Sequence, residues 1–78
     1  MTQHDAVLVI DACGLNCPLP VLRLRKRLQA MAVGDAVELV ATDRAALRDV
    51  PAFCHAQGHS IVAIGDEPDG TLRFRIHK

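Results

Sequence analysis

The apolar residues of this chain alternate between the spacing of a β-strand and the spacing of an α-helix. Residues 6–10 are continuously apolar and mostly β-branched, which predicts a strand buried on both faces or nearly so. Residues 18–31 predict a helix, because apolar side chains recur on one face at helical spacing. The residues of this face are Val21, Leu24, Leu28, Met31 and Ala32.

The middle of the chain repeats the strand and helix. Residues 36–42 alternate apolar and polar positions as a half-buried strand does, and Asp43 is a suitable N-cap for the helical residues after it. Pro51 interrupts that helix. The pattern therefore allows either one kinked helix or a short first turn and a second helix over residues 50–57, ended by Gly58.

The chain ends in two adjacent strands, residues 60–64 and 71–76, around a turn rich in Gly and Asp. The order β-α-β-α-β-β predicts an α/β fold, a two-layer α/β sandwich with a four-stranded mixed sheet and two helices on one face. Its first two strands are expected to be parallel and its last two antiparallel. We expect a single domain over residues 1–78, because this length leaves room for one core.

Composition narrows the classes of partner. Nine basic and nine acidic residues give a net charge of zero, which argues against direct contact with nucleic acid or an anionic membrane. The first residues lack the basic region of a signal peptide, and no apolar run approaches membrane-spanning length. Three cysteines cannot pair completely, which fits a reducing compartment. We expect a cytoplasmic monomer.

The candidate chemistry lies at Cys17, which begins a Cys-Pro-Leu-Pro motif. Pro18 disfavours a helical conformation for Cys17 and suits the first helical position, and Pro20 is tolerated in the same turn. We therefore expect Cys17 at the N-cap, with the Leu19 N–H as the one free first-turn donor for its sulfur. The positive end of the helix dipole would lower the thiol pKa, so the motif predicts an exposed, moderately activated nucleophile.

Two segments resemble a known family. Residues 11–20 read Asp-Ala-Cys-Gly-Leu-Asn-Cys-Pro-Leu-Pro, a basic helix follows, and residues 48–54 read Arg-Asp-Val-Pro-Ala-Phe-Cys. With these features the chain closely resembles the TusA/SirA/YedF family of sulfur carrier proteins over essentially its whole length. The resemblance implies the fold predicted above, and it implies that Gly14, Pro18 and Pro20 support the cysteine motif.

By this resemblance, Cys17 accepts a sulfane sulfur as a persulfide and passes it to another protein. The resemblance implies a cysteine desulfurase or a rhodanese as sulfur donor and a sulfurtransferase as acceptor. Family members deliver sulfur toward tRNA thiolation, molybdenum cofactor assembly or dissimilatory sulfur oxidation. Leu19 stands where members that serve tRNA thiolation often carry a polar or acidic residue, which leaves the acceptor open.

The densest charge run follows the motif and is either a solvated helix face or a docking surface beside Cys17. A docking surface of this kind would steer an acidic patch of the sulfur donor or acceptor. We expect acidic and basic residues of the later helix to line the other side of the same edge. The candidate docking residues are Arg23, Lys26 and Arg27, and across from them Asp43, Arg48 and Asp49.

A second thiol leaves an alternative function open. Cys13 precedes Cys17 by four residues, and it either forms a disulfide with Cys17 or is a small side chain at a strand end. The first reading makes the chain a thiol redox or regulatory module. No general base, oxyanion cluster or cofactor motif accompanies Cys17, which favours a carrier with no cofactor and no independent catalytic apparatus.

The remaining cysteine and two histidines carry weaker signals. We expect Cys54 to be a buried core thiol of the second helix, since free cysteine is among the most buried residue types. His55 and His59 have the spacing of a metal-binding pair. Gly58 between them is expected to end the helix and remove their shared face, so we expect no metal site.

Overall fold

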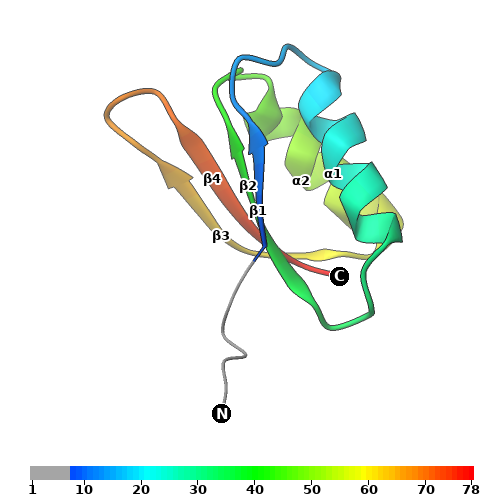
Figure 1. Ribbon diagram of the computed structural model, residues 1–78. Helices are drawn as coiled ribbons and strands as arrows, with labels where there is room; N and C mark the ends of the chain where they lie inside the picture. The colour runs from blue at the N-terminus through cyan, green and yellow to red at the C-terminus, as the bar shows by residue number, and fades with distance from the viewer. Residues whose placement is uncertain (1–7) are drawn as a thin grey trace.

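The computed structural model describes residues 8–78, which form one sheet with both helices against the same face (Figure 1). The order confirms the predicted two-layer α/β sandwich. Residues 6 and 7 of the first predicted strand lie outside the described residues. The elements are β1 (Leu8–Ala12), α1 (Leu19–Gln29), β2 (Ala36–Ala41), α2 (Ala46–Gln57), β3 (Ser60–Asp66) and β4 (Leu72–His77).

The strands lie in the order β1-β2-β4-β3, with β1 parallel to β2 and the other neighbours antiparallel. This confirms both the parallel first pair and the final hairpin. The register pairs Ala12 with Ala41, so β1 and β2 end side by side at one edge of the sheet. The loops that lead into α1 and α2 therefore start next to each other, at the upper end of the sheet in Figure 1.

The prediction that the first strand is buried on both faces is wrong. Strand β1 lies at an edge of the sheet, and only Ile10 and Ala12 of its five residues are buried. The side chain of Val9 points to the face without helices, where the residue is 53% exposed. A continuous apolar run does not distinguish a central strand from an edge strand, because its composition says nothing about the number of neighbours.

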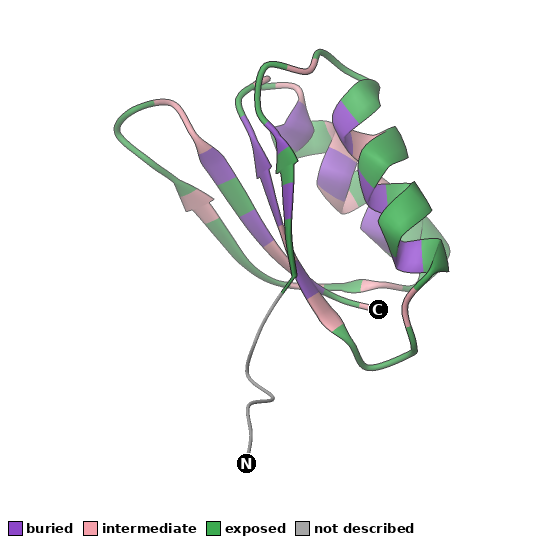
Figure 2. Ribbon diagram, in the orientation of Figure 1, coloured by how far each residue is buried: buried purple, intermediate pink, exposed green. Residues whose placement is uncertain are grey.

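The core lies between the sheet and the two helices and is almost entirely aliphatic around Phe74. Figure 2 shows the buried positions on the facing sides of both layers. Helix α1 contributes Leu24 and Leu28, with Val21 and Met31 packed at the edge of the core, as the helical spacing predicted. Ala32 is exposed, because α1 ends at Gln29 before the predicted face is complete.

Helix α2 runs through Pro51 as one helix, so no second helix begins at Val50. Pro51 lacks the N–H that would reach the Leu47 carbonyl, so the helix continues through this residue with one backbone hydrogen bond fewer. Gly58 adopts φ 78°, a left-handed conformation that glycine enters without strain, and it ends the helix as predicted. Within residues 8–78, neither helix is long and apolar enough to cross a membrane.

Candidate functional site

Two hydrogen bonds join the loop after β1 to the loop after β2. The Gly14 N–H donates to Thr42 Oγ1 at 2.9 Å, and the Cys17 N–H donates to Asp43 Oδ2 at 2.6 Å. Gly14 has φ 81°, which favours glycine at this point of the motif. The loop that carries Cys17 is therefore held at two points by the loop after β2, whose residues lie more than 25 positions away in the sequence.

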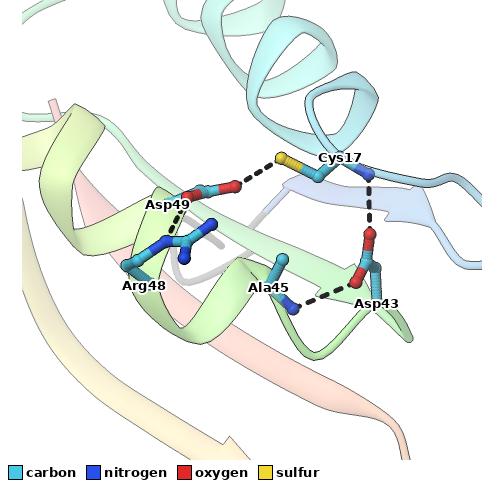
Figure 3. A network of polar contacts seen from close by, with 5 residues as sticks. All are labelled: Cys17, Asp43, Ala45, Arg48 and Asp49. Carbon is cyan, nitrogen blue, oxygen red and sulfur yellow. Dashed lines mark hydrogen bonds and ion pairs between the residues drawn. The ribbon is translucent and has the colours of Figure 1, made fainter.

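Asp43 is the central anchor of this arrangement (Figure 3). Its second oxygen, Oδ1, accepts the Ala45 N–H at 3.0 Å and so caps the turn that leads into α2. The helix itself begins at Ala46 with Ala45 as its cap residue, so the prediction of Asp43 as the helix N-cap is wrong. The N–H groups of Ala45 and Cys17 hold the pKa of the Asp43 carboxyl below its usual value. Both carboxyl oxygens thus have internal donors, and a role of Asp43 in docking stays a prediction.

Cys17 lies one residue before the helix cap, so the prediction of an N-cap cysteine is wrong. Helix α1 begins at Leu19, and Pro18 occupies the cap position with φ −98° and ψ 16°. The Cys17–Pro18 peptide bond is cis. The Leu19 N–H donates to the Asn16 carbonyl at 2.8 Å. That donor is therefore not available to the sulfur, contrary to the expectation from the sequence.

The Cys17 thiol instead donates a hydrogen bond to Asp49 Oδ2 on α2 (Figure 3). The other oxygen of Asp49 accepts the Arg48 Nε–H at 3.0 Å. The Arg48 side chain is 80% exposed, whereas that of Asp49 is 23% exposed. A short polar chain thus runs from the sulfur through a half-buried carboxylate to a solvent-facing guanidinium.

These carboxylates raise the pKa of Cys17 above its ordinary value. The hydrogen bond to Asp49 is the main cause, followed by burial and the negative charges of Asp49 and Asp43, while Arg48 acts in the opposite direction. The same bond, with Arg48, lowers the pKa of Asp49. The expected lowering of the Cys17 pKa by the helix N-terminus is therefore wrong for the free protein, whose contacts raise this pKa and favour the protonated thiol.

Cys17 faces a small cleft between the first turns of α1 and α2. The cleft is so shallow that it encloses no volume that a water molecule could occupy. Ligand pockets in proteins typically measure about 300–1,000 Å³, so this cleft is too small to enclose a substrate. The site thus presents an exposed sulfur to another surface. Its lining residues are Cys17, Pro18, Pro20, Val21, Asp43, Ala46 and Asp49.

Three leucines on the first turns of α1 and α2 are exposed, and of these the sequence analysis named only Leu19. Leu19 and Leu22 lie on the first turns of α1, and Leu47 lies on the first turn of α2. We call these three residues the apolar collar. Leu19 and Leu22 stand opposite the buried stripe at Leu24 and Leu28, so the helical period itself contained the signal. Exposed apolar side chains next to a reactive group are typical of a surface that another protein covers.

The candidate docking residues divide into two sets. Asp49 and Arg48 contact Cys17 directly or through one another. On α1, the Arg23 guanidinium donates to the Asp11 carbonyl at 2.9 Å, so it is anchored to the end of β1. Lys26 and Arg27 are exposed and have no ion pair with any described residue, about two helical turns beyond the start of α1.

Cys13 and Cys54 have different environments. Cys13 is an exposed free thiol whose pKa is raised by burial and by Asp11, which also accepts the Cys13 N–H at 2.9 Å. Cys54 is buried as predicted, and burial raises the pKa of its thiol to about 11. Cys17 is thus an exposed thiol with a carboxylate partner on a different element.

His59 follows the end of α2 and packs its ring 5.9 Å from the ring of Phe53, measured between centroids. Gly58 separates His59 from the helix that carries His55, as the sequence predicted. No group of three potential metal ligands occurs within residues 8–78.

The similarity to known proteins extends over all the residues that the structure describes. The family model for the sulfurtransferase TusA matches residues 8–78. The chain belongs to the TusA family. The sulfur carrier protein TusA of Pseudomonas entomophila is 43% identical over 75 residues, covering 96% of this chain and 90% of that relative. TusA of Pseudomonas putida strain GB-1 is 38% identical over 78 residues, covering 100% and 96%.

A solved structure shows the same fold. The SirA-like protein of Desulfitobacterium hafniense superposes with a TM-score of 0.82 at 22% identity, covering 91% of this chain and 96% of that chain. Membership of the TusA family confirms the resemblance drawn from the Cys-Pro-Leu-Pro motif, and the superposition confirms the fold class.

Proposed function

We propose that this chain is a sulfur carrier that holds sulfane sulfur as a persulfide on Cys17 and passes it to an acceptor protein. The observation that carries the proposal is the setting of Cys17. In a member of the TusA family, an exposed thiol stands on a loop that Asp43 pins, beside a cleft too small to enclose a substrate. Such a thiol is accessible to another protein's sulfur.

Each transfer is an exchange between sulfur atoms and needs no outside oxidant. The Cys17 thiolate attacks the terminal sulfur of a persulfide on the donor, a new S–S bond forms at Cys17, and the donor's S–S bond breaks. The donor cysteine leaves as a thiolate. Delivery repeats the exchange, with the acceptor cysteine attacking the outer sulfur and Cys17 leaving. The proton of Cys17 passes to solvent or to the docked partner.

The donor and acceptor supply the chemistry that this site lacks. We propose a cysteine desulfurase or a rhodanese as donor and a sulfurtransferase as acceptor, meeting in the cytoplasm. The apolar collar and the basic residues Lys26 and Arg27 support a docking surface around Cys17. The acceptor would belong to tRNA thiolation, cofactor assembly or dissimilatory sulfur oxidation.

Mass spectrometry after incubation with a cysteine desulfurase and cysteine tests the proposal. We expect the peptide that contains Cys17 to gain the mass of one sulfur atom, and the Cys17→Ser variant to gain none while keeping its fold. Cys13→Ser is the matched control and should load normally. Loss of two hydrogen atoms from a peptide joining Cys13 and Cys17 would instead support the thiol redox function, and loading of Cys17→Ser would contradict the carrier.

A further inference from the structure

We infer that Asp49 is a latch that keeps Cys17 a neutral thiol in the free protein, and that a cationic side chain of the docked partner releases it. This inference rests on the proposed carrier function and adds how its thiol is controlled. It assigns Asp49 a positioning role toward the reacting sulfur. It also assigns a charge to the part of the partner that lies nearest to Cys17.

The latch has a fixed geometry. The backbone of Cys17 is held by Asp43 at 2.6 Å, so the thiol stays within reach of α2. Asp49 uses one oxygen for the thiol and the other for the neighbouring Arg48. A carboxylate in this place accepts a hydrogen bond from the protonated thiol, but its negative charge repels a thiolate. The contact therefore favours the unreactive form of Cys17.

The charged groups that act on Cys17 come from two segments. Asp43 belongs to the loop after β2, and Asp49 and Arg48 belong to α2. From α1, the guanidinium of Arg23 is engaged with the Asp11 carbonyl. Among the described residues, Arg48 is thus the cation that opposes the two carboxylates, and it is also largely solvent-facing.

Transfer requires the opposite state of the sulfur, because the thiolate is the nucleophile. Asp49 is a poor acceptor for the proton, since its own pKa is lowered by Cys17 and Arg48. A lysine or arginine of the partner placed against Asp49 would satisfy its carboxylate and lower the cost of forming the thiolate. An acidic group there would draw Arg48 away from Asp49 and strengthen the hold on the thiol.

The partner surface is therefore expected to have mixed charge. A basic side chain would meet Asp49 beside the sulfur, and acidic side chains would meet Lys26 and Arg27 further along α1. In the absence of a partner, the latch protects an exposed cysteine, because susceptibility to oxidation follows thiolate character and exposure. Activation would then accompany docking.

The latch is tested on the free protein by the pH dependence of Cys17 alkylation with iodoacetamide, in a Cys13→Ser background. We expect Asp49→Asn to shift the midpoint of the rate profile to lower pH and to raise the rate at neutral pH several-fold, since one pKa unit changes the thiolate fraction about tenfold. Glu67→Gln removes the same charge from an exposed residue of the turn between β3 and β4, and should leave the profile unchanged.

Arg48→Gln is expected to shift the midpoint in the opposite direction to Asp49→Asn. It therefore tests the latch even if Asp49→Asn loses its structure. It removes the cation that opposes the carboxylates from a side chain that is 80% exposed, so the midpoint should move to higher pH in a folded protein. Unchanged midpoints in both variants would overturn the latch. They would leave the carrier proposal intact, because sulfur loading of Cys17 is measured separately.

Release by the partner is tested by comparing two electrophiles. With iodoacetamide, Asp49→Asn should react faster than the wild type at neutral pH. With a persulfide-loaded cysteine desulfurase, the gain should be much smaller or reversed, because in the wild type the partner already neutralises Asp49. An equal gain with both electrophiles would show that docking does not release the latch and would overturn that part of the inference.

Discussion

At Cys17, two electrostatic influences act in opposite directions, and the carboxylates prevail over the helix. The helix N-terminus acts through free N–H groups of the first turn, but the Leu19 N–H is already bonded to the Asn16 carbonyl. Asp49 contacts the sulfur directly. The local motif predicted the reactive residue and its exposure. It did not predict its protonation, because Asp49 lies 32 residues away and reaches the sulfur only through the fold.

The buried thiol of Cys54 makes the free energy of unfolding depend on pH. Burial raises the pKa of its thiol from 9.0 to about 11, so the folded state favours the neutral form. That stabilisation is complete below the unfolded pKa and is lost as pH rises toward the folded value. Between pH 9 and 11, we expect the free energy of unfolding to fall more in the wild type than in Cys54→Ala. Parallel curves from urea denaturation would contradict a buried, neutral thiol.

At the scale of single elements, periodic patterns predicted the helices better than the strand environments. The spacing of Leu24 and Leu28 correctly predicted the buried face of α1. The apolar composition of β1 gave a wrong environment, because edge or centre depends on strand order. In α2, Pro51 marked a possible break, but α2 is one continuous element whose residues Val50 and Cys54 on either side of Pro51 are buried in the core. Exposed Leu19 and Leu22 lay within the same pattern as the face opposite the core.

Helix α1 offers a matched pair for testing its basic face. Lys26 lies on the outward side, whereas Arg25 lines a different hollow with Phe53 and His59. We expect Lys26→Glu to lower the association rate with the sulfur donor several-fold, with a weaker effect at high salt, because charge complementarity mainly affects encounter. Arg25→Glu makes the same charge change and should have little effect. Equal losses would favour a net-charge effect over a docking face.

Arg23 is unsuitable for this test because its substitution would also remove the hydrogen bond to the Asp11 carbonyl. A loss of binding in Arg23→Glu would therefore mix docking with the anchoring of β1 to α1. Lys26 and Arg25 carry no such bond to the described residues, so their stabilities should stay near that of the wild type.

At the scale of the whole molecule, the parallel pairing of β1 and β2 creates the site. It brings two loops to one edge of the sheet, where Gly14 bonds to Thr42 and Cys17 bonds to Asp43. The β-α-β-α-β-β order predicted this adjacency from the sequence. The individual hydrogen bonds could not be predicted, because each joins loop residues whose geometry is set by the finished fold.

The hydrogen bond between Gly14 and Thr42 should make a measurable contribution to the free energy of unfolding. Thr42→Val keeps the shape of the side chain but removes the acceptor for the Gly14 N–H. We expect the free energy of unfolding to fall by about 0.5–1.5 kcal/mol, towards the lower end because the bond is exposed. Hydrogen exchange of the Gly14 amide should also become faster. Thr71→Val, in the turn before β4, is the control and should leave the exchange of the Gly14 amide unchanged. Unchanged Gly14 exchange in Thr42→Val would contradict the hydrogen bond that holds the loop.

The central claim is that Cys17 alone carries the sulfur. A variant with Cys13→Ser and Cys54→Ala keeps Cys17 as its single cysteine. It can be loaded from a cysteine desulfurase with radioactive cysteine, separated from the donor and mixed with an acceptor sulfurtransferase. We predict close to one labelled sulfur per protein, removable by a reducing agent and lost when the acceptor is added. A variant that takes up no label, or keeps it in the presence of every acceptor and of the reducing agent, would contradict a carrier at Cys17.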